Sequence, residues 1–221
     1  MSSLKNKNVI VTAGPTHEAI DPVRFIGNHS SGKMGYAIAK SLVDKQASVT
    51  LISGPSNLTP PEGVKFISVT SALEMYEETL NAFQNCDAYI LSAAVADYKP
   101  ATIAKNKIKK KGDTLTLELI KTVDIAAELG KKKTPNQVAV GFALETTNEE
   151  KHALEKLVKK KFNFIVLNSL RNEGTCFGSD QNKISIITTY SKKDYPQKNK
   201  VAVANDIVSF LETYYEENIF A

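Results

Sequence analysis

Short runs of β-branched residues alternate along this chain with segments whose apolar residues recur at helical spacing. The runs with strand character are residues 8–13, 48–52, 64–68, 87–91, 138–142 and 164–167. The segments with helical spacing are residues 33–45, 72–83, 125–129, 148–160 and 202–214. Strands that alternate with helices in this way are typical of a parallel sheet with helices on both faces. We therefore predict an α/β protein.

The alternation is interrupted in the middle of the chain and again near its end. Residues 100–112 are rich in lysine and have no obvious period, whereas residues 114–119 alternate as a half-buried strand does. We predict a small β excursion from the main sheet here. Residues 169–182 are rich in Gly, Asn and Ser and are long enough to form a lid over a ligand. Residues 183–188 alternate again, which indicates a later strand. An antiparallel orientation is one option for this strand.

The composition excludes several classes of protein. With 42% hydrophobic and 24% charged residues, the 221-residue chain can bury a full core, so disorder along its whole length is excluded. No apolar run approaches the roughly 20 residues that a membrane span needs, and residues 1–8 carry no hydrophobic signal segment. Cys86 and Cys176 are too few for a disulfide scaffold or a four-cysteine zinc site, and we expect both to be inert. These features favour a cytoplasmic protein.

The positive charge is modest but clustered. The 28 basic and 24 acidic residues leave a net charge of +4, which does not by itself indicate binding to nucleic acid. Three lysine runs lie at residues 109–111, 131–133 and 159–161. Such runs suit a solvated surface, and they also suit a polyanionic ligand such as a nucleoside triphosphate. His17, His29 and His152 do not have the spacing of metal ligands.

Three of the predicted strands end in small residues. These ends are residues 14–16, 92–97 and 141–143. In open α/β sheets, ligands bind beyond the carboxyl ends of the strands. Tight packing would explain one such end, whereas three together favour a shared crevice. Asp97 at one of them suits a magnesium ion, a ribose or a base, and equally a helix or turn cap.

Residues 27–35 read Gly-Asn-His-Ser-Ser-Gly-Lys-Met-Gly and open a predicted helix. Exposed backbone N–H groups beside the positive end of a helix dipole favour phosphate, although a plain capped helix would have similar residues. A P-loop is not indicated, because Met34 replaces its Ser or Thr and no strand directly precedes the segment. Lys156 and Lys160 lie four residues apart, so they share one helical face that either holds phosphates or faces solvent.

Several of these segments together resemble one family. Residues 14–16, 21–26, 28–35, 93–98, 107–110 and 141–143 look like the corresponding motifs of phosphopantothenoylcysteine synthetase, the ligase half of the bacterial bifunctional coenzyme A protein. The resemblance extends over nearly the whole chain, and the motif from Asp21 to Gly35 is its most specific part. Because the usual flavin-dependent decarboxylase half is absent, the chain resembles the stand-alone, CTP-dependent form of this synthetase.

The resemblance implies a ligase of coenzyme A biosynthesis. Such an enzyme activates the carboxylate of 4′-phosphopantothenate with CTP and Mg²⁺ to give an acyl-cytidylate and pyrophosphate. L-Cysteine then displaces CMP to form 4′-phosphopantothenoylcysteine. It also implies a homodimer in which the partner chain completes part of each crevice, with no nucleic-acid or membrane partner. ATP replaces CTP in eukaryotic members. The rival hypothesis is an NAD(P)-binding oxidoreductase or a nucleotide sensor on the same fold.

The resemblance also assigns roles to individual positions, while the metal ligands stay unassigned. The catalytic residues it implies are Asn28 and Lys107. Phosphopantothenate would bind at Asn28, Gly32, Lys33, Ala93 and Ala94. The nucleotide would bind at Leu91, Ser92, Ala93, Asp97, Lys107, Val123, Asp124, Ile125, Ala126, Phe142, Lys156 and Lys160. Two positions depart from the family, namely Thr122-Val123 in place of Asn-Pro and Asn168-Ser169 in place of Asn-Asp.

Taken together, we predict one ligase domain over residues 1–221. Its fold is expected to be a Rossmann-like, doubly wound and mostly parallel sheet, with the small β excursion and the lid loop described above.

Overall fold

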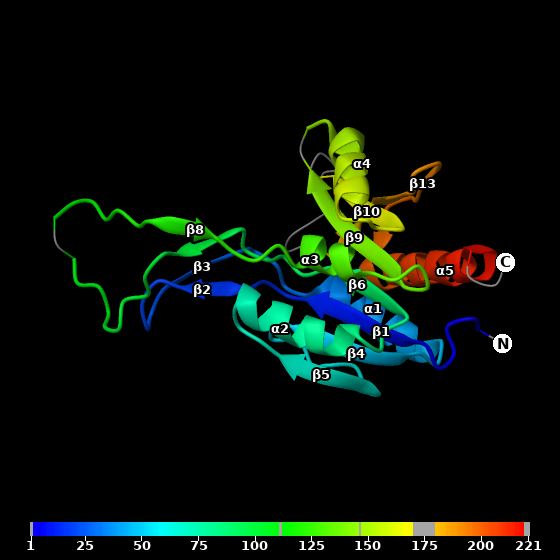
Figure 1. Ribbon diagram of the computed structural model, residues 1–221, viewed down its shortest axis with the longest axis horizontal. Helices are drawn as coiled ribbons and strands as arrows, with labels where there is room; N and C mark the ends of the chain where they lie inside the picture. The colour runs from blue at the N-terminus through cyan, green and yellow to red at the C-terminus, as the bar shows by residue number, and fades with distance from the viewer. Residues whose placement is uncertain (1, 111, 146, 170–179, 219–221) are drawn as a thin grey trace.

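The computed structural model describes residues 2–110, 112–145, 147–169 and 180–218 (Figure 1). An eight-stranded sheet forms its centre, with the strand order β13-β12-β10-β9-β6-β1-β4-β5. Its strands are β1 (Asn8–Ala13), β4 (Ser48–Ser53), β5 (Val64–Ser68), β6 (Ala88–Leu91), β9 (Val138–Glu145), β10 (Phe164–Ser169), β12 (Ile184–Ile187) and β13 (Lys192–Asp194). In this order, the neighbours β10, β9, β6, β1, β4 and β5 pair in parallel. The pairs β10–β12 and β12–β13 are antiparallel.

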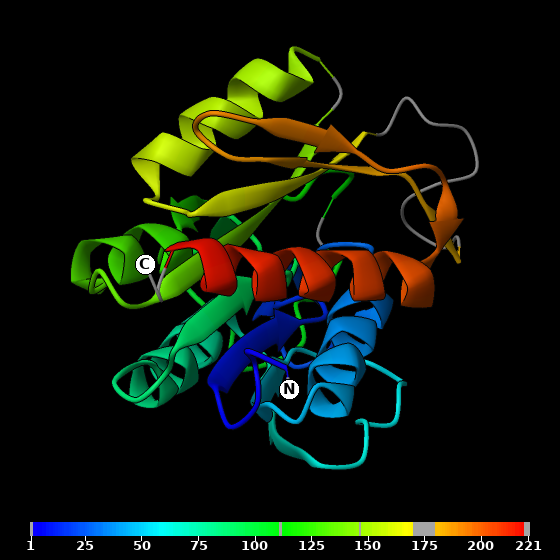
Figure 2. The ribbon, with the colours of Figure 1, turned by 90° about the vertical axis from the view of Figure 1, so that its right-hand side faces the viewer.

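Two helices cover one face of the sheet. They are α1 (Lys33–Asp44) and α5 (Lys200–Asn218), which lie side by side and cross the strands (Figure 2). Val9 and Val11 of β1 and Val140 of β9 point to this face and are buried against helix residues such as Ile38 and Val208. Because successive strand residues alternate between faces, the same strands also supply the core of the opposite layer.

Three helices cover the other face. They are α2 (Ala72–Phe83), α3 (Ile125–Lys132) and α4 (Glu149–Lys159). Their buried residues Met75, Leu129 and Leu157 share a core with Ile10 and Ile165 of the sheet. This arrangement confirms the predicted α/β fold, a mostly parallel sheet with helices on both faces.

Local sequence accounts for where α2 begins. The Ser71 hydroxyl accepts a hydrogen bond from the Glu74 N–H at 3.2 Å, and the Glu74 carboxylate accepts one from the Thr70 N–H at 2.8 Å. The hydroxyl thus satisfies an N–H group that has no partner within the helix, and the carboxylate holds the residue before the N-cap against the first turn, in a variant of the capping box. The predicted bounds of this helix, residues 72–83, agree with the observed ones.

A long arm extends from the carboxyl edge of the sheet (Figure 1). It consists of residues 17–27 and residues 98–121, and this name is used for these two segments below. The first segment holds the hairpin of β2 (His17–Ala19) and β3 (Phe25–Gly27), and the second begins and ends with β7 (Tyr98–Pro100) and β8 (Leu119–Lys121). The β2–β3 hairpin lies in a stretch for which the sequence indicated no element.

The predicted β excursion exists, but its strand was placed wrongly. Residues 114–118 alternate in the sequence yet form no strand, and β8 begins only at Leu119. The reason is that a strand needs a partner with a matching register. β7 pairs with residues 119–121 alone, and toward residues 114–118 the described chain adds a single backbone hydrogen bond to the ladder, from the Ala101 N–H to the Glu118 carbonyl.

The end of the chain agrees with the prediction in part. The expected antiparallel strand at residues 183–188 is present as β12. The expected lid at residues 169–182 falls largely outside the described residues, and its described end forms β11 (Gln181–Asn182), which pairs with β14 (Lys198–Asn199). None of the helices in the described part of the chain has the length and hydropathy to cross a bilayer.

Cys86 is buried at the amino edge of the sheet, and we expect it to be unreactive. Burial raises the pKa of its thiol to about 12, although Gln137 donates a hydrogen bond to the sulfur at 3.4 Å. In a Cys176→Ser variant, a thiol reagent at pH 8 should therefore modify Cys86 about a thousandfold more slowly in the folded protein than after unfolding. Equal rates in the two states would contradict this prediction.

Candidate active site

The carboxyl ends of β1, β6 and β9 meet at one edge of the sheet. β1 and β6 are adjacent, although the chain leaves β1 toward β4 on one side and reaches β6 only after β5. Such a reversal of strand order opens a crevice between the loops that follow the two strands. Here the two loops touch through a parallel bridge between Pro15 and Ala94. The three predicted small-residue ends are thus brought together.

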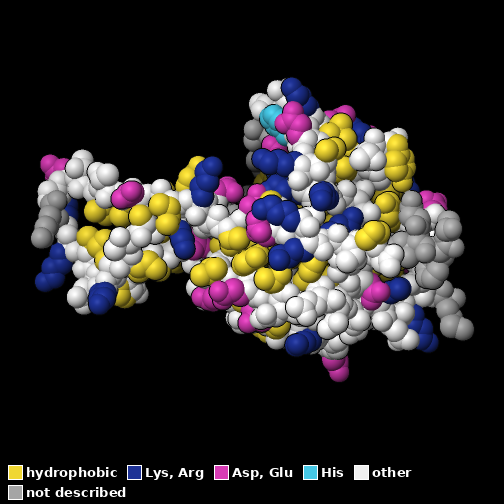
Figure 3. Space-filling model, viewed as in Figure 1, with side chains coloured by type: hydrophobic (Ala, Val, Ile, Leu, Met, Phe, Trp, Pro, Cys, Tyr) yellow, Lys and Arg dark blue, Asp and Glu magenta, His cyan; other side chains and the backbone are white. Residues whose placement is uncertain are grey.

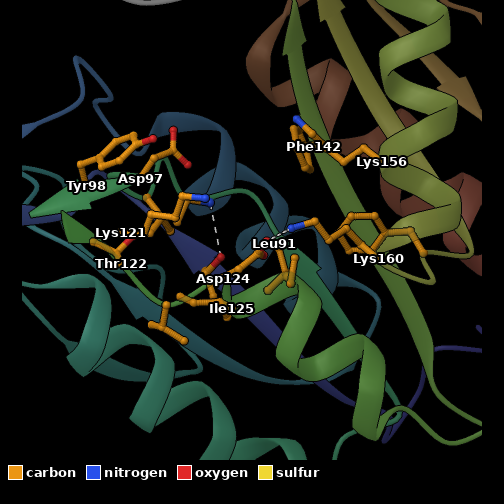
Figure 4. A pocket seen from close by; sticks show the side chains of 16 residues that line it. Leu91, Asp97, Tyr98, Lys121, Thr122, Asp124, Ile125, Phe142, Lys156 and Lys160 are labelled. Carbon is orange, nitrogen blue, oxygen red and sulfur yellow. Dashed lines mark hydrogen bonds and ion pairs between the residues drawn. The ribbon is translucent and has the colours of Figure 1, made fainter. Parts of the chain in front are cut away.

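A cavity of about 520 Å³ lies at this edge, on the side of α3 and α4 (Figure 4). The strand ends, the first turn of α3 and one face of α4 form its wall. Ten of the residues expected to bind the nucleotide line it, namely Leu91, Ala93, Asp97, Val123, Asp124, Ile125, Ala126, Phe142, Lys156 and Lys160. A cavity of this size, lined by apolar side chains and a few charged groups, suits a small-molecule ligand.

Asp124 and Lys160, which both line this cavity, form an ion pair (Figure 4). Asp124 is also the N-cap of α3, since its carboxylate accepts a hydrogen bond from the Ala127 N–H at 3.0 Å. Burial would raise the pKa of Asp124, but the ammonium group of Lys160 and this N–H together hold it below the usual carboxyl value. The ionised carboxylate therefore fixes the position of Lys160.

Lys156 lies one helical turn from Lys160 and also faces the cavity (Figure 4). Its ammonium group is 3.3 Å from a carboxylate oxygen of Glu145 at the end of β9, and His152 Nδ1 is 3.5 Å from the other oxygen. Lysine side chains gather beside α4 on this face of the molecule (Figure 3). The local charge is therefore suited to an anionic ligand.

A second cavity of about 190 Å³ lies at the start of α1, on the opposite face of the sheet. Gly32 caps this helix in the left-handed conformation (φ 81°), which glycine adopts at little cost. Among the described residues, no side chain accepts a capping hydrogen bond from the N–H groups of the first turn. The free N–H groups of that turn are available to an anion. Gly32, Lys33, Ser92 and Ala94 line the cavity, together with Ser30, Ser31, Met34, Gly35, Ala93, Phe142, Ala143, Leu144, Asn168, Asn182, Ile184 and Lys200.

Two further features mark the second cavity. The Asn168 side-chain oxygen is buried and has no hydrogen-bond partner in the described part of the chain. Lys33 pairs with Asp180, with 2.6 Å between the ammonium nitrogen and a carboxylate oxygen. This pair connects the start of α1 to the described end of the predicted lid.

The two cavities adjoin each other. Ala93 and Phe142 line both of them. Asn28 lines neither, but its side-chain amide donates a hydrogen bond to the Ala94 carbonyl at 3.0 Å, which places it at the rim of the second cavity. Two ligands bound in the two cavities would therefore meet at the end of β6.

Lys107 is the predicted site residue that the structure does not bring to the others. It lies in the arm, between β7 and β8, with an exposed side chain, and it lines neither cavity of its own chain. In Figure 1 the middle of this segment stands well away from the sheet. The fold of one chain thus assembles the larger cavity without Lys107.

Sequence reasoning missed six residues of the larger cavity. They are Thr12, Val95, Tyr98, Lys121, Thr122 and Phe162. Thr12 lies close to one of the predicted small-residue strand ends and Val95 lies within another, so their place in the sequence could have identified them. Phe162 follows α4 and its ring lies where a side chain at residue 141 would be, since an added Cβ at Gly141 would come within 2.2 Å of it. No local sequence pattern predicts this contact between Phe162 and Gly141.

The acidic side chains at this edge are too few to hold a metal ion by themselves. No group of three or more His, Cys, Asp or Glu residues with a metal-binding arrangement occurs in the described residues. Asp97 and Asp124 are the carboxylates that line the larger cavity. Mg²⁺ commonly keeps several waters and binds one or two carboxylates together with substrate phosphates, so these residues fit an ion that arrives with a nucleotide.

Comparison with known proteins gives the family. A family model of the DNA/pantothenate metabolism flavoprotein C-terminal domain matches residues 4–214. The coenzyme A biosynthesis bifunctional protein CoaBC of Haemophilus influenzae is 43% identical over 216 residues, which are 98% of this chain and 54% of that protein. A protein named cysteine/cysteine sulfinic acid decarboxylase, of an unknown prokaryotic organism, is 47% identical over 207 residues, 93% of this chain and 58% of that protein.

The chain thus spans about half the length of the curated relatives it matches. Among solved structures, the C-terminal domain of CoaBC superposes with a TM-score of 0.84 and 39% identity, over 98% of this chain and 100% of that domain. The family match, the relatives and the fold agree. The chain therefore belongs to the family of DNA/pantothenate metabolism flavoprotein C-terminal domains.

Proposed function

We propose that this chain is a phosphopantothenate–cysteine ligase domain that joins 4′-phosphopantothenate to L-cysteine at the expense of CTP. The observation that carries the proposal is the junction of two anion-suited cavities at Ala93 and Phe142. A reaction between two bound anions requires that their reacting groups meet in one place. The family and its similarity to a domain of CoaBC support the same activity.

In the proposed reaction, a carboxylate oxygen of phosphopantothenate attacks the α-phosphorus of CTP. The bond from that phosphorus to the bridging oxygen breaks, and pyrophosphate leaves. The cysteine amine then attacks the acyl carbon, loses a proton, and displaces CMP. The protein supplies no nucleophile, so it accelerates the reaction by positioning the reactants and by neutralising charge.

Each part of the site has a task in this scheme. Lys156 and Lys160 bind the nucleotide phosphates in the larger cavity, and Lys107 neutralises the charge that develops on them. The first turn of α1, with Gly32 and Lys33, binds an anionic group of the second reactant. Asn28, which is held on the Ala94 carbonyl, contacts the acyl-cytidylate. Mg²⁺ would add positive charge on the phosphate oxygens, with Asp97 as its protein ligand.

The experiment that tests the proposal is release of pyrophosphate from CTP by the purified protein. We expect release that requires Mg²⁺ and 4′-phosphopantothenate, and amide product once L-cysteine is added. ATP in place of CTP tests the choice of base. If a folded protein releases no pyrophosphate from either nucleotide, the ligase assignment is wrong. Tight NAD(P) binding in that case would favour the oxidoreductase hypothesis.

The two lysines of α4 give a direct test of the larger cavity. Replacing Lys156 and Lys160 together by glutamine should raise KM for CTP by about ten- to a hundredfold, since each charge-assisted contact to phosphate is lost. Lys159→Gln is the matched control, because Lys159 is an exposed lysine of the same helix that does not line the cavity. An equal change in KM for the control would place the nucleotide elsewhere.

We further infer a homodimer in which the arm reaches the partner. Large apolar side chains on the arm are exposed, among them Val23 (60%), Phe25 (53%), Ile103 (59%) and Leu115 (58%). Figure 3 shows hydrophobic side chains gathered on the arm. Apolar surface gathered on a projection favours burial against another protein. A second copy would also bring an arm, and with it Lys107, to a cavity that lacks this residue in its own chain.

Co-expression of two inactive variants tests this sharing of the site. If Lys107 acts across the dimer, Lys107→Gln and Asn28→Asp chains in equal amounts should regain about a quarter of wild-type activity, because half of the dimers carry one intact site. Each variant alone should stay inactive. Recovery is not expected if Lys107 serves its own chain, and a monomer in sedimentation experiments would contradict the dimer itself.

Two further expectations stay predictions. A synthetase that works without a fused decarboxylase half is tested by the mass of the native protein in a cell extract. A cytoplasmic location is tested by fractionation of the same cells.

A further inference from the structure

Asp21 is a buried carboxylate in the turn between β2 and β3, far in sequence from Lys107. Its side chain has no exposed surface. One oxygen accepts hydrogen bonds from the N–H groups of Val23 at 2.8 Å and Arg24 at 2.9 Å. The other oxygen accepts the N–H of Ile108 at 3.0 Å, which connects the two segments of the arm. Both oxygens are therefore used.

Arg24 completes the contact from the same turn. Its guanidinium lies 3.3 Å from the second oxygen of Asp21 and donates a hydrogen bond to the Ile108 carbonyl at 3.2 Å. The N–H and the C=O of Ile108 are thus both bound, one by each member of an ion pair. A planar guanidinium can make both contacts at once, which an ammonium group cannot do with the same geometry.

These contacts flank Lys107. On its other side, the Ala104 N–H donates to the Ile20 carbonyl at 3.0 Å. Between β7 and β8 the described residues form no helix or strand, so no ladder of hydrogen bonds holds the backbone there. A segment of this kind has high conformational entropy unless specific contacts restrict it. The contacts at residues 104 and 108 supply that restriction.

We propose that Asp21 is a positioning residue, which holds the backbone at Ile108 together with Arg24 and so sets the direction of Lys107. The proposal rests on the proposed function, because the role of Lys107 belongs to it. Asp21 lines neither cavity, and it acts on the reaction only through the segment that it holds.

The chemistry of the site requires a carboxylate. Burial would raise the pKa of Asp21, but the N–H groups of Ile108, Val23 and Arg24 and the guanidinium of Arg24 hold it below its usual value. An asparagine here keeps one oxygen for the turn and presents an NH₂ group to the Ile108 N–H. Two donors would then face each other, and the contact to Ile108 would be lost.

The first experiment measures the segment itself, without any assay of activity. In Asp21→Asn, hydrogen exchange at the Ile108 amide and trypsin cleavage between residues 105 and 110 should both become about ten- to a hundredfold faster. Asp113→Asn is the matched control, because Asp113 is an exposed carboxylate of the same arm. Unchanged exchange and cleavage in Asp21→Asn would overturn the proposal.

The second experiment measures pyrophosphate release. We expect kcat to fall about tenfold or more in Asp21→Asn, with KM for CTP within about threefold of wild type, because the cavity that binds the nucleotide is untouched. In a Lys107→Gln background, Asp21→Asn should cause no further loss, since its effect passes through Lys107. Equal losses in both backgrounds would show a general structural role and overturn the proposal.

A milder variant covers the case in which Asp21→Asn does not fold. Arg24→Lys keeps the positive charge at a half-exposed side chain but removes the planar guanidinium that contacts both Asp21 and the Ile108 carbonyl. This variant should also speed hydrogen exchange at the Ile108 amide. If it does not, the proposal fails. Absence of pyrophosphate release from the wild-type protein would reject the proposed function instead, while the exchange data would still decide whether Asp21 holds the segment.

Discussion

A Lys107→Gln variant should release pyrophosphate from CTP at no more than about a hundredth of the wild-type rate and should keep the fold of the wild-type protein. Pyrophosphate leaves with additional negative charge, and a lysine ammonium at that point stabilises the transition state. Removal of a single well-placed donor of this kind commonly costs about a hundred- to a thousandfold in kcat. The loss should fall on kcat more than on KM, because the other nucleotide contacts stay in place.

The fold should tolerate this change because the Lys107 side chain is exposed and no hydrogen bond or ion pair involving it occurs among the described residues. Thermal unfolding followed by circular dichroism should give the wild-type midpoint. Lys105→Gln, at an exposed lysine two residues away, serves as the control and should keep full activity. Normal pyrophosphate release from Lys107→Gln would remove Lys107 from the catalytic residues.

A Gly54→Ala variant should be strongly destabilised, although its φ lies outside the left-handed region. An added Cβ would lie 1.6 Å from the carbonyl oxygen of Pro15 and 2.8 Å from its carbonyl carbon. Both are backbone atoms, which cannot swing aside as a side chain does. We expect a loss of about 3 kcal/mol or more in the free energy of unfolding, above the usual range for overpacking.

Gly54→Ala should also disturb the candidate active site. Pro15 forms the bridge to Ala94, and the Ala94 carbonyl accepts hydrogen bonds from Thr16 and Asn28. The midpoint of thermal unfolding should fall by about 6–12 °C, at about 2–4 °C for each kcal/mol in a domain of this size. Gly112→Ala is the control, because a Cβ there meets nothing within 4 Å and only its positive φ opposes the change. Equal midpoints for both variants would contradict the clash.

Much of the fold could be read from local patterns. α2 was predicted at its observed bounds because apolar residues at helical spacing act over a few positions. β1 and β5 were found as well, since β-branched runs between turn residues have few other interpretations. Residues 114–118 show the limit of such reasoning. Their alternation is that of a strand, but no neighbouring strand pairs with them.

The candidate site divides in the same way. The small residues at the strand ends and the first turn of α1 were identified from the sequence, and topology alone predicts that they meet. The ion pair between Asp124 and Lys160 could not be foreseen from local spacing, because Asp124 caps the start of α3 and Lys160 caps the end of α4. The contact of Phe162 with Gly141 depends likewise on packing between a strand and the residues after α4.

The sequence by itself determined the order of strands and helices, the parallel sheet and the motif that resembles one family of ligases, because these follow from periodicity, caps and residue types within short windows. The tertiary structure alone decided that two cavities adjoin at Ala93 and Phe142, that Lys107 stands apart from both, and that Asp21 holds the backbone 87 residues away at Ile108. Contacts of that kind form only when a whole chain packs, since no local preference encodes which distant group a buried carboxylate will bind.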